Sequence, residues 1–294
     1  MAKHSRLPRK PGKVVPEATR SADESMPSSQ ADGANTKQTL VLTKVFRLLD
    51  AFTGVAPELT ISELRSITGY PATTCARLVR NLVDERILDR VEDRYRIGLG
   101  VLRWSAAALR NLDVVPRLTP IMEQLRDETG ESAGVYVRRG AARTCVAYAP
   151  TRHAVIWQLH VGMVTPIHVG SGSRAILAFD EEAQEEVLSG ELAAFTDETM
   201  ADPDSLEDAL DQTRTTGLAI SRNELAEDVA GISAPVFSAS GGVVASIGIA
   251  GPGSRFKETD INRHKGAVLA AGRRGSEAFS GNFPFGQIDD PEQR

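Results

Sequence analysis

Cysteine is scarce in this chain, which has two in 294 residues. Cys75 and Cys145 lie far apart and belong to no CxxC or Cys/His spacing, so the sequence predicts neither a disulfide framework nor a structural zinc site. Long apolar runs are also absent, since no stretch approaches the roughly 18 residues that a membrane-spanning helix needs. The basic first residues, MAKHSRLPRKPGK, lack the apolar segment of a secretory signal. We therefore expect a cytoplasmic protein with no membrane partner.

A recognisable catalytic or phosphate-binding constellation is missing as well. The segment GSGSRA at 170–175 lacks the GxxxxGK[ST] spacing of a phosphate-binding loop. His168 has no matched Ser or Cys nucleophile motif, and a lone histidine is more often a hydrogen-bonded structural residue. The acidic run DEEAQEEV at 180–187 is typical of a solvated helix face. We predict that the chain is not an enzyme and uses no cofactor or metal ion.

Positive charge is short in the C-terminal part of the chain. Residues 101–294 hold 18 Lys or Arg against 27 Asp or Glu, whereas residues 37–100 hold 10 against 8 and residues 1–36 hold 6 against 4. This asymmetry permits a polyanion to contact the N-terminal part and disfavours such a contact further along the chain.

The first periodic segments predict two helices. From Leu40, apolar residues recur at helical spacing until Gly54 interrupts them. TISELRSITG then predicts a short second helix, with Thr60 or Ser62 as its N-cap and Gly69 at its end.

The segment PATTCARLVRNLVDERILDR, from 71 to 90, predicts a third helix that leads into a strand. On a helical wheel its outer side carries Arg77 and Arg80, while its inner side collects Cys75, Leu78, Val79, Leu82 and Val83. RILDRVEDRYRIG alternates apolar and polar residues, which predicts a two-stranded hairpin. Two helices, a tight turn, a third helix and a hairpin follow one another in the order of a winged helix-turn-helix.

The arginines of the third helix have two possible explanations. Standing alone, they would indicate only a solvated helix face. Major-groove binding, however, requires small residues that approach base edges and cations that meet phosphates, and this helix opens with small hydroxyl residues beside a basic hairpin. We therefore predict that DNA is bound by Thr73, Thr74, Arg77, Arg80, Arg90, Arg94 and Arg96.

The C-terminal two thirds of the chain change period. LGVLRWSAAALRNLDVVPRLTPIMEQLRDETGES predicts two helices interrupted near Pro116, and Thr259 to about Phe279 predicts a closing helix. Between them, a period near two predicts six strands in SAGVYVRRG, RTCVAYAP, AVIWQLHVG, GLAISRNE, GISAPVFSASGG and VVASIGIAGP. Strands flanked by helices at both ends predict an α/β sensor-like domain with a central, mostly antiparallel sheet.

The predicted fold class is therefore α+β. The expected parts are a disordered tail (1–37), a winged helix-turn-helix DNA-binding domain (38–99), a linker helix (100–113), an effector-binding domain (114–281) and a C-terminal tail (282–294).

From about Thr39 to Phe279 the chain resembles the isocitrate-lyase-regulator (IclR) type of transcription factor. ISELRSITGYPATTCARLVRNLVDERIL is similar to the family's helix-turn-helix, and YRIGLGVL to its wing-to-linker junction. GMVTPIHVGSGSRAILA resembles the loop and helix over its effector pocket, and GLAISRNELAEDVAGISAPVFSASGGVVASIGIAGP its signature before the last strand. The resemblance implies a winged helix joined to a GAF-like domain by a linker helix.

This resemblance also implies partners and a role. They are a double-stranded DNA operator, a small-molecule effector and a second copy of the chain, as a dimer or a dimer of dimers, in a repressor or activator of a catabolic operon. Where the family has Lys or a similar polar residue before the recognition-helix hydroxyls, this chain has Ala72, so base contact would depend on Thr73, Thr74 and Arg77.

The effector pocket departs from the family pattern. The resemblance implies carboxylate binding through loop amides, an Asp, a Cys and two Ser, and the matching positions here are Gly170, Ser171, Ser221, Gly231, Gly248 and Ala250. A carboxylate buried without donors costs several kcal/mol, roughly 2–7 for an unpaired polar group and more for a charge, and small side chains enlarge a pocket. We therefore expect a larger, less polar effector, aromatic or cyclic, anchored by Ser171 or Ser221 and by Arg174 at the helix start.

Three alternatives stay open at this point. The pocket can be vestigial, with the domain serving only for dimerisation. The chain can be a small-molecule-metabolising enzyme with an accessory winged helix, or an interaction module whose winged helix binds protein rather than DNA.

Overall fold

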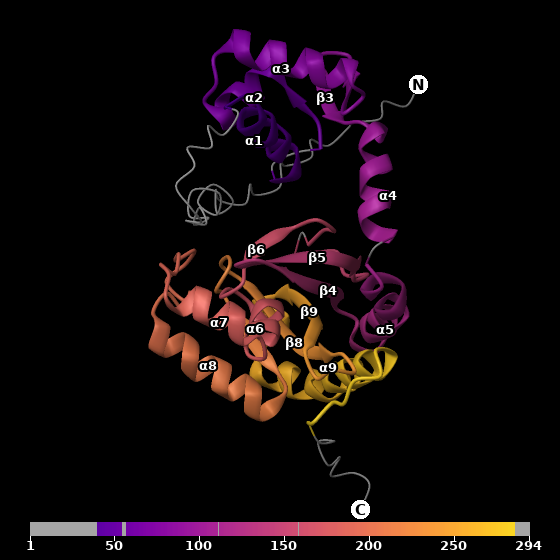
Figure 1. Cartoon of the computed structure of the whole chain (residues 1–294), viewed down its shortest axis with the longest axis vertical. Coiled ribbons are helices and arrows are strands. Elements are labelled where there is room, and N and C mark those ends of the chain that lie inside the picture. The colour runs from indigo at the N-terminus through magenta and orange to yellow at the C-terminus, as the bar shows by residue number, and fades with distance from the viewer. Residues whose placement is uncertain (1–39, 55–56, 111, 158, 286–294) are drawn as a thin grey trace, which may run out of the picture.

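The computed structural model of this chain describes residues 40–54, 57–110, 112–157 and 159–285, so the predicted tail at 1–37 lies outside the described residues. An upper unit and a lower unit are joined on one side by a single helix (Figure 1). The N-terminal unit contains α1 (Leu40–Gly54), β1 (Leu59–Thr60), α2 (Ile61–Thr68), α3 (Ala72–Asp84), β2 (Leu88–Val91) and β3 (Arg94–Ile97).

The N-terminal unit confirms the predicted order of helices and hairpin and adds one strand. β1 pairs antiparallel with β3, which gives a three-stranded sheet in the order β1-β3-β2 instead of a two-stranded hairpin. The two residues of β1 are too few to show a period of two, so no sequence pattern predicts this strand.

Local capping chemistry fixes the ends of α2. The Thr60 side chain accepts a hydrogen bond from the Glu63 amide at 3.2 Å, and the Glu63 carboxylate accepts one from the Thr60 amide at 2.7 Å. This capping box satisfies two amide groups that the first helical turn leaves without partners. Gly69 ends the helix with φ of +71°, a conformation that glycine adopts without the steric cost of a Cβ atom.

The linker follows the predicted order of two helices. A 3₁₀ turn (Leu99–Val101) leads into α4 (Leu102–Arg110), and α5 (Val114–Thr129) follows. The break between α4 and α5 ends at Asp113, close to Pro116 as predicted, and Pro116 itself lies inside α5. Pro116 is accommodated in the first turn of α5, where backbone amides have no helical acceptor to lose.

The C-terminal unit is built on a six-stranded antiparallel sheet in the order β6-β5-β4-β9-β8-β7. Helices cover both of its faces (Figure 1). One face packs against α5 and α9 (Glu258–Ala278), and the other against α6 (Ser171–Leu177), α7 (Glu181–Leu188) and α8 (Pro203–Thr216). The strands are β4 (Ser132–Arg139), β5 (Ala142–Ala149), β6 (Val164–Pro166), β7 (Ala219–Arg222), β8 (Val229–Phe237) and β9 (Val243–Pro252).

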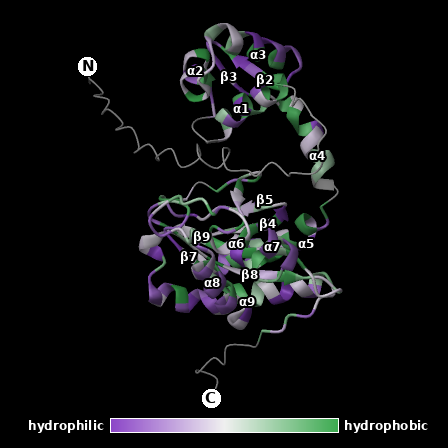
Figure 2. Cartoon of the chain, turned by 60° about the vertical axis from the view of Figure 1, so that its left-hand side comes forward, coloured by the Kyte–Doolittle hydropathy of each residue, from purple (hydrophilic) through white to green (hydrophobic). Residues whose placement is uncertain are grey.

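Each face of the sheet has its own hydrophobic core. Hydrophobic residues gather in the interior of the C-terminal unit, and hydrophilic ones on the outer side of α8 (Figure 2). The core under α5 and α9 includes Leu118, Leu125 and Val268, and the core under α6 includes Ile167 and Leu177. None of the helices in the described part of the chain has the length and hydropathy needed to cross a membrane.

One strand prediction is wrong. AVIWQLHVG, at 154–162, forms no strand where the structure describes it, and the edge strand β6 lies further on. Val155 and Ile156 are exposed, so the alternation has no sheet face to bury. At the other end of the chain, Phe283 and Phe285 pack against Phe237, so the packed domain extends past its expected boundary at 281.

Candidate functional site

The recognition-helix candidate, α3, has one buried and one exposed face. Cys75, Leu78, Val79 and Leu82 are buried. Thr73, Arg77 and Arg80 are exposed, and Thr74 is half-buried beside them. Pro71 precedes the helix and makes no side-chain cap hydrogen bond, so the first turn of α3 presents only small side chains, Ala72 and Thr73, to the solvent. The structure therefore brings the four predicted α3 residues onto one side of the helix.

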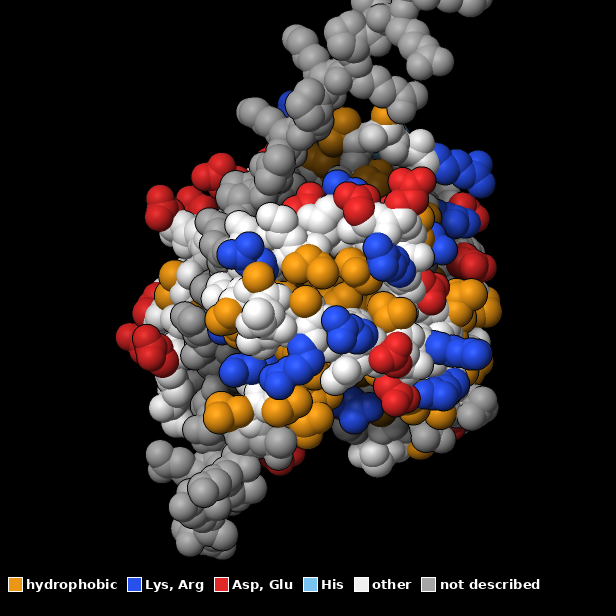
Figure 3. Space-filling view, turned by 90° about the horizontal axis from the view of Figure 1, so that it is seen from above, with side chains coloured by type: hydrophobic (Ala, Val, Ile, Leu, Met, Phe, Trp, Pro, Cys, Tyr) orange, Lys and Arg blue, Asp and Glu red, His pale blue; other side chains and the backbone are white. Residues whose placement is uncertain are grey.

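Arg77 and Arg80 make no ion pair or hydrogen bond within the described part of the chain. Lys and Arg side chains are spread over the top of the N-terminal unit, with hydrophobic patches between them (Figure 3). An exposed arginine without a protein partner keeps its donors available for a phosphate or a base edge.

The wing arginines are arranged differently from α3. Arg94 donates to the Glu58 carbonyl at 3.0 Å and pairs with Glu63 at 3.3 Å, and Arg96 lies 3.6 Å from the Glu58 carboxylate. Arg90 is exposed, and its Nε donates to the Glu92 carbonyl at 2.8 Å across the hairpin turn. Arg94 and Arg96 thus tie the wing to β1 and α2, while the remaining donors of Arg90 face solvent.

A basic residue on α2 escaped the sequence analysis. Arg65 is exposed and lines a shallow hollow at the turn between α2 and α3, together with Ser62, Ser66, Gly69, Tyr70 and Pro71. Its position on the outer side of α2, opposite the buried Leu64, was readable from helical periodicity.

The C-terminal unit encloses a small cavity between α6 and the sheet. Its volume is about 30 Å³, well below the roughly 300–1,000 Å³ of typical ligand sites. Gly170, Ser171, Ser221, Gly231 and Ala250, all predicted from the sequence, line it. The other lining residues are Tyr136, Arg143, Trp157, Leu159, Gly172, Glu224, Leu225, Val229 and Ala230.

The cavity is smaller than the predicted small residues suggest, because Ser171 packs against Gly231 and the Tyr136 ring packs against Gly134 and Gly172. A Cβ atom on Gly172 would lie 2.7 Å from the Tyr136 ring, and one on Gly134 would lie 2.7 Å from its hydroxyl. Gly248 does not line the cavity, since a Cβ atom there would point at Ser233, 2.1 Å from its Oγ. The glycines of this region therefore allow close packing and leave little open volume.

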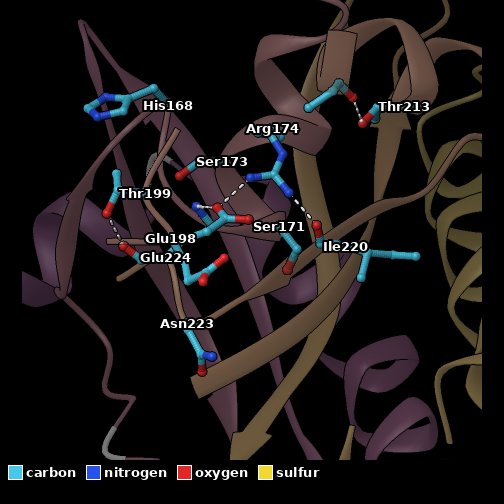
Figure 4. A network of polar contacts seen from close by, with 12 residues as sticks. His168, Ser171, Ser173, Arg174, Glu198, Thr199, Thr213, Ile220, Asn223 and Glu224 are labelled. Atoms are coloured by element: carbon cyan, nitrogen blue, oxygen red, sulfur yellow. Dashed lines mark hydrogen bonds and ion pairs between the residues drawn. The ribbon is translucent and has the colours of Figure 1, made fainter. Parts of the chain in front are cut away.

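Arg174 lies outside the cavity lining and is held by protein partners. It is 2 % exposed, pairs with the carboxylate of Glu224 and donates a second hydrogen bond to the Ile220 carbonyl (Figure 4). Glu224 is 4 % exposed and also accepts a hydrogen bond from the Gly170 amide at 2.9 Å. The predicted anchoring of an effector by Arg174 conflicts with this arrangement, because the charge of Arg174 is already balanced by Glu224.

Arg143, like Glu224, is a charged residue of the cavity that the sequence analysis missed. It is 6 % exposed, and its guanidinium carbon lies 4.2 Å from the centre of the Tyr136 ring. Its Nε has no hydrogen-bond partner, and no carboxylate pairs with it within the described residues. The signal was its alternation with Cys145 in RTCVAYAP, which puts both side chains on the inner face of β5.

The hydroxyls and nearby titratable groups complete the site. Ser171 and Ser233 share a hydrogen bond of 3.0 Å between their side-chain oxygens. Burial raises the pKa of Tyr136 to about 12 and that of the Cys145 thiol to about 11, so both groups are neutral at pH 7. Burial also lowers the pKa of His168, whose Nε2 lies 3.0 Å from the Ala193 carbonyl, as expected for a structural histidine.

An N-terminal winged helix-turn-helix, joined to a separate domain that encloses a small cavity, is the architecture of a one-component transcriptional regulator. Residues 41–92 match the IclR helix-turn-helix domain, and residues 106–277 match the C-terminal domain of the bacterial transcriptional regulator IclR. The chain belongs to the IclR family of bacterial transcriptional regulators.

Individual relatives agree with this assignment. The HTH-type transcriptional regulator KipR of Bacillus subtilis is 32% identical over 225 residues, covering 74% of this chain and 90% of KipR. A solved IclR transcriptional regulator from Alicyclobacillus acidocaldarius superposes with a TM-score of 0.66 at 24% identity, covering 82% of this chain and 99% of that one. An IclR homologue from Microbacterium hydrocarbonoxydans, solved with 4-hydroxybenzoate, has a TM-score of 0.64 at 24% identity, with 82% and 99% covered. At that identity the two solved structures support the fold.

Proposed function

We propose that this regulator binds a DNA operator through α3 and releases or tightens it when a small organic effector occupies the cavity under α6. The observation that carries the DNA half is the pair of exposed arginines on α3, which have no partner among the residues that the structure describes. In this proposal Thr73, Thr74 and Arg77 meet base edges, and Arg80, Arg90 and Arg65 meet phosphates. Arg94 and Arg96 act mainly by holding the wing against α2.

Arg77→Glu tests the DNA proposal by fluorescence anisotropy on the DNA upstream of the gene. Loss of one base-reading arginine and gain of a repulsive charge should weaken binding by at least ~10-fold, because a bidentate base contact is worth about 1–3 kcal/mol. Arg139→Glu, an exposed arginine of the C-terminal sheet, is the matched control. Unchanged operator affinity of Arg77→Glu in a folded protein would contradict the docking and favour a winged helix that binds protein.

Self-association is the second part of the proposal. α1 and the linker expose large apolar side chains, among them Phe46 (61 %), Leu99 (76 %) and Leu102 (59 %). Surfaces of this kind mark protein contacts, and two recognition helices one DNA turn apart require a two-fold partner. We infer a dimer that pairs these surfaces, working in the bacterial cytoplasm where the DNA lies.

Sedimentation velocity on Leu102→Asp tests the dimer. The aspartate would bury a charge in the proposed dimer interface, so it should shift the protein toward monomer and weaken operator binding. Leu225→Asp, which lies in the cavity region and not on this surface, should leave the oligomeric state unchanged. A dimer of undiminished stability in Leu102→Asp would remove this surface from the proposal.

The effector is proposed to be an aromatic or cyclic compound. Trp157, Leu159, Leu225 and Val229 supply an apolar lining, and the homologue from Microbacterium hydrocarbonoxydans accommodates an aromatic ring in the same fold. Ligand sites have volumes of roughly 300–1,000 Å³, so a ring must displace part of the lining of the present cavity. The exposed segment around Trp157 is the part least held by secondary structure.

Coupling between cavity and operator follows from linkage. An effector that loosens DNA must bind the DNA-free form more tightly, by about 1–3 kcal/mol in typical cases, and the path of communication is α4. Titrating the operator complex with candidate aromatic compounds, and measuring the change in anisotropy, tests this part. An effector domain that only dimerises would bind none of them in a way that changes operator affinity.

A further inference from the structure

Among the residues that the structure describes, Arg143 carries the one charge in the proposed effector cavity that no protein side chain balances. Of the lining residues that the structure describes, only Arg143 and Glu224 are charged, and Glu224 is committed to Arg174 and to the Gly170 amide. The other polar neighbours of Arg143, Tyr136 and Cys145, are neutral because burial raises the pKa of each. A buried cation without an anion is costly, so a bound anion here would supply the missing counter-charge.

A second buried polar atom lies beside Arg143 without a partner. Thr165, on β6, is directly opposite Arg143 in the β5–β6 register, and paired residues of antiparallel strands share a face. Thr165 is 1 % exposed, and its Oγ1 has no hydrogen-bond partner in the structure. Unpaired buried polar groups are rare in folded proteins, and two of them side by side favour this place as a site for a hydrogen-bonding ligand.

Arg143 is also held in place before any ligand arrives. Its guanidinium stacks on the Tyr136 ring, and that ring rests on the backbone of Gly172 in α6. Stacking fixes the plane of the guanidinium fork and so lowers the cost of ordering it on binding. The amide of the α6 loop, by contrast, already donates to Glu224 (Figure 4).

We propose that Arg143, which lines the cavity, and its cross-strand neighbour Thr165, which lies outside the present lining, bind the anionic end of the effector and select one with a single carboxylate on a flat apolar body. This inference rests on the proposed effector function and names the residues that determine its specificity. The Gly170 amide before α6 already donates to the Glu224 carboxylate, so in this proposal the effector carboxylate lies at strands β5 and β6 instead. The apolar body lies against Trp157 and Leu225.

Trp157 gives a direct readout of this site. The chain has two tryptophans, and the half-exposed Trp104 can be replaced by phenylalanine so that Trp157 alone fluoresces. Benzoate, cyclohexanecarboxylate and the neutral isostere benzamide are the probes, each titrated into the full-length Trp104→Phe protein. The variants are Arg143→Gln, Arg143→Lys and Thr165→Val, with Arg139→Gln as the matched control on the exposed end of β4.

We expect at least one carboxylate to bind the parent protein, and Arg143→Gln to weaken that binding roughly 10- to 100-fold, as for loss of a charge-assisted hydrogen-bond pair. Arg143→Lys should recover part of the loss, since it keeps the charge without the fork, and Arg139→Gln should change nothing. Benzamide should not distinguish the parent protein from Arg143→Gln. Without ligand, Arg143→Gln should melt no lower than the parent protein, because it removes an unbalanced charge, whereas a purely structural arginine would lower the melting temperature.

The proposal is overturned if no carboxylate changes the Trp157 emission of the parent protein, or if the carboxylates bind Arg143→Gln as tightly as they bind the parent. Operator binding distinguishes failure of the anion site from failure of the proposed DNA-binding function, because Arg143→Gln without effector should bind DNA like the parent protein. An effector whose control of DNA survives Arg143→Gln would refute the anion site and leave the regulator intact. A carboxylate that binds through Arg143 without any change in operator affinity would support the site and refute the proposed coupling.

Discussion

Replacing Glu224 with glutamine would leave the guanidinium of Arg174 buried without a counter-charge. Both side chains are nearly inaccessible, at 2 % and 4 % exposure, and the pair joins α6 to the end of β7. Breaking a buried ion pair by removing one partner costs about 3–5 kcal/mol, because the remaining charge is stranded away from water. Glutamine still accepts from the Gly170 amide, so we expect a loss near the lower end, about 3 kcal/mol.

That loss is measurable by calorimetry of the C-terminal unit. For a domain of 150–250 residues, each kcal/mol shifts the melting temperature by about 2–4 °C, which predicts a drop of roughly 6–12 °C. Glu258→Gln is the control, because it breaks an ion pair with Arg222 of similar length, 2.7 Å, whose side chains are 49 % and 67 % exposed. Exposed pairs contribute at most about 1 kcal/mol.

A double replacement separates the loss of the ion pair from the cost of leaving one charge buried alone. Arg174→Met combined with Glu224→Leu removes both charges at once and should be more stable than Glu224→Gln alone, since buried pairs tolerate apolar replacement. If Glu224→Gln melts within a degree or two of Glu258→Gln, Arg174 must reach water or another anion, and the buried pair described here would not exist in solution.

Further predictions concern the two units separately. Thr60→Ala should cost about 1 kcal/mol in the N-terminal unit by removing the N-cap of α2, and chemical denaturation followed by circular dichroism should show it; an unchanged midpoint would mean that Glu63 caps the helix by itself. Gly172→Ala should destabilise the C-terminal unit by about 1–3 kcal/mol, because the new methyl group overlaps the Tyr136 ring, and a wild-type melting temperature would refute that packing. Burial lowers the pKa of His168 below its ordinary 6.5, so the stability contributed by its neutral ring is complete above pH 6.5 and declines as the pH falls. In urea titrations at several pH values, the free energy of unfolding should therefore decline less steeply with falling pH in His168→Gln than in the parent protein. An equal decline in the two proteins would contradict the lowered pKa.

Features that depend on neighbouring residues could be predicted from the sequence. The capping box of α2, the glycine at its end and the inner and outer faces of α3 are set within one or two helical turns. The matched motifs also identified the family and part of the cavity lining, because Ser171, Ser221 and Gly231 lie in segments whose order along the chain is characteristic.

Features that depend on partners distant in sequence could not be predicted. Arg174 looked available at the start of α6 because nothing nearby balances it, yet its partner Glu224 lies 50 positions further on. Pro116 looked like a helix breaker because the start of α5 was not known. AVIWQLHVG has the alternation of a strand, but no sheet face was available to bury it.

The sequence by itself determined the helices, their caps, the arginine-bearing face of α3 and the family, because these follow from residue spacing and local hydrogen bonding. Only the tertiary structure decided the charge of the cavity under α6. The Tyr136 ring packs against Gly134 and Gly172, Glu224 balances Arg174, and Arg143 is left as the cavity's unbalanced cation among the residues described. Charge balance in a buried site is set by which side chains meet across the fold, and that depends on all the strands at once.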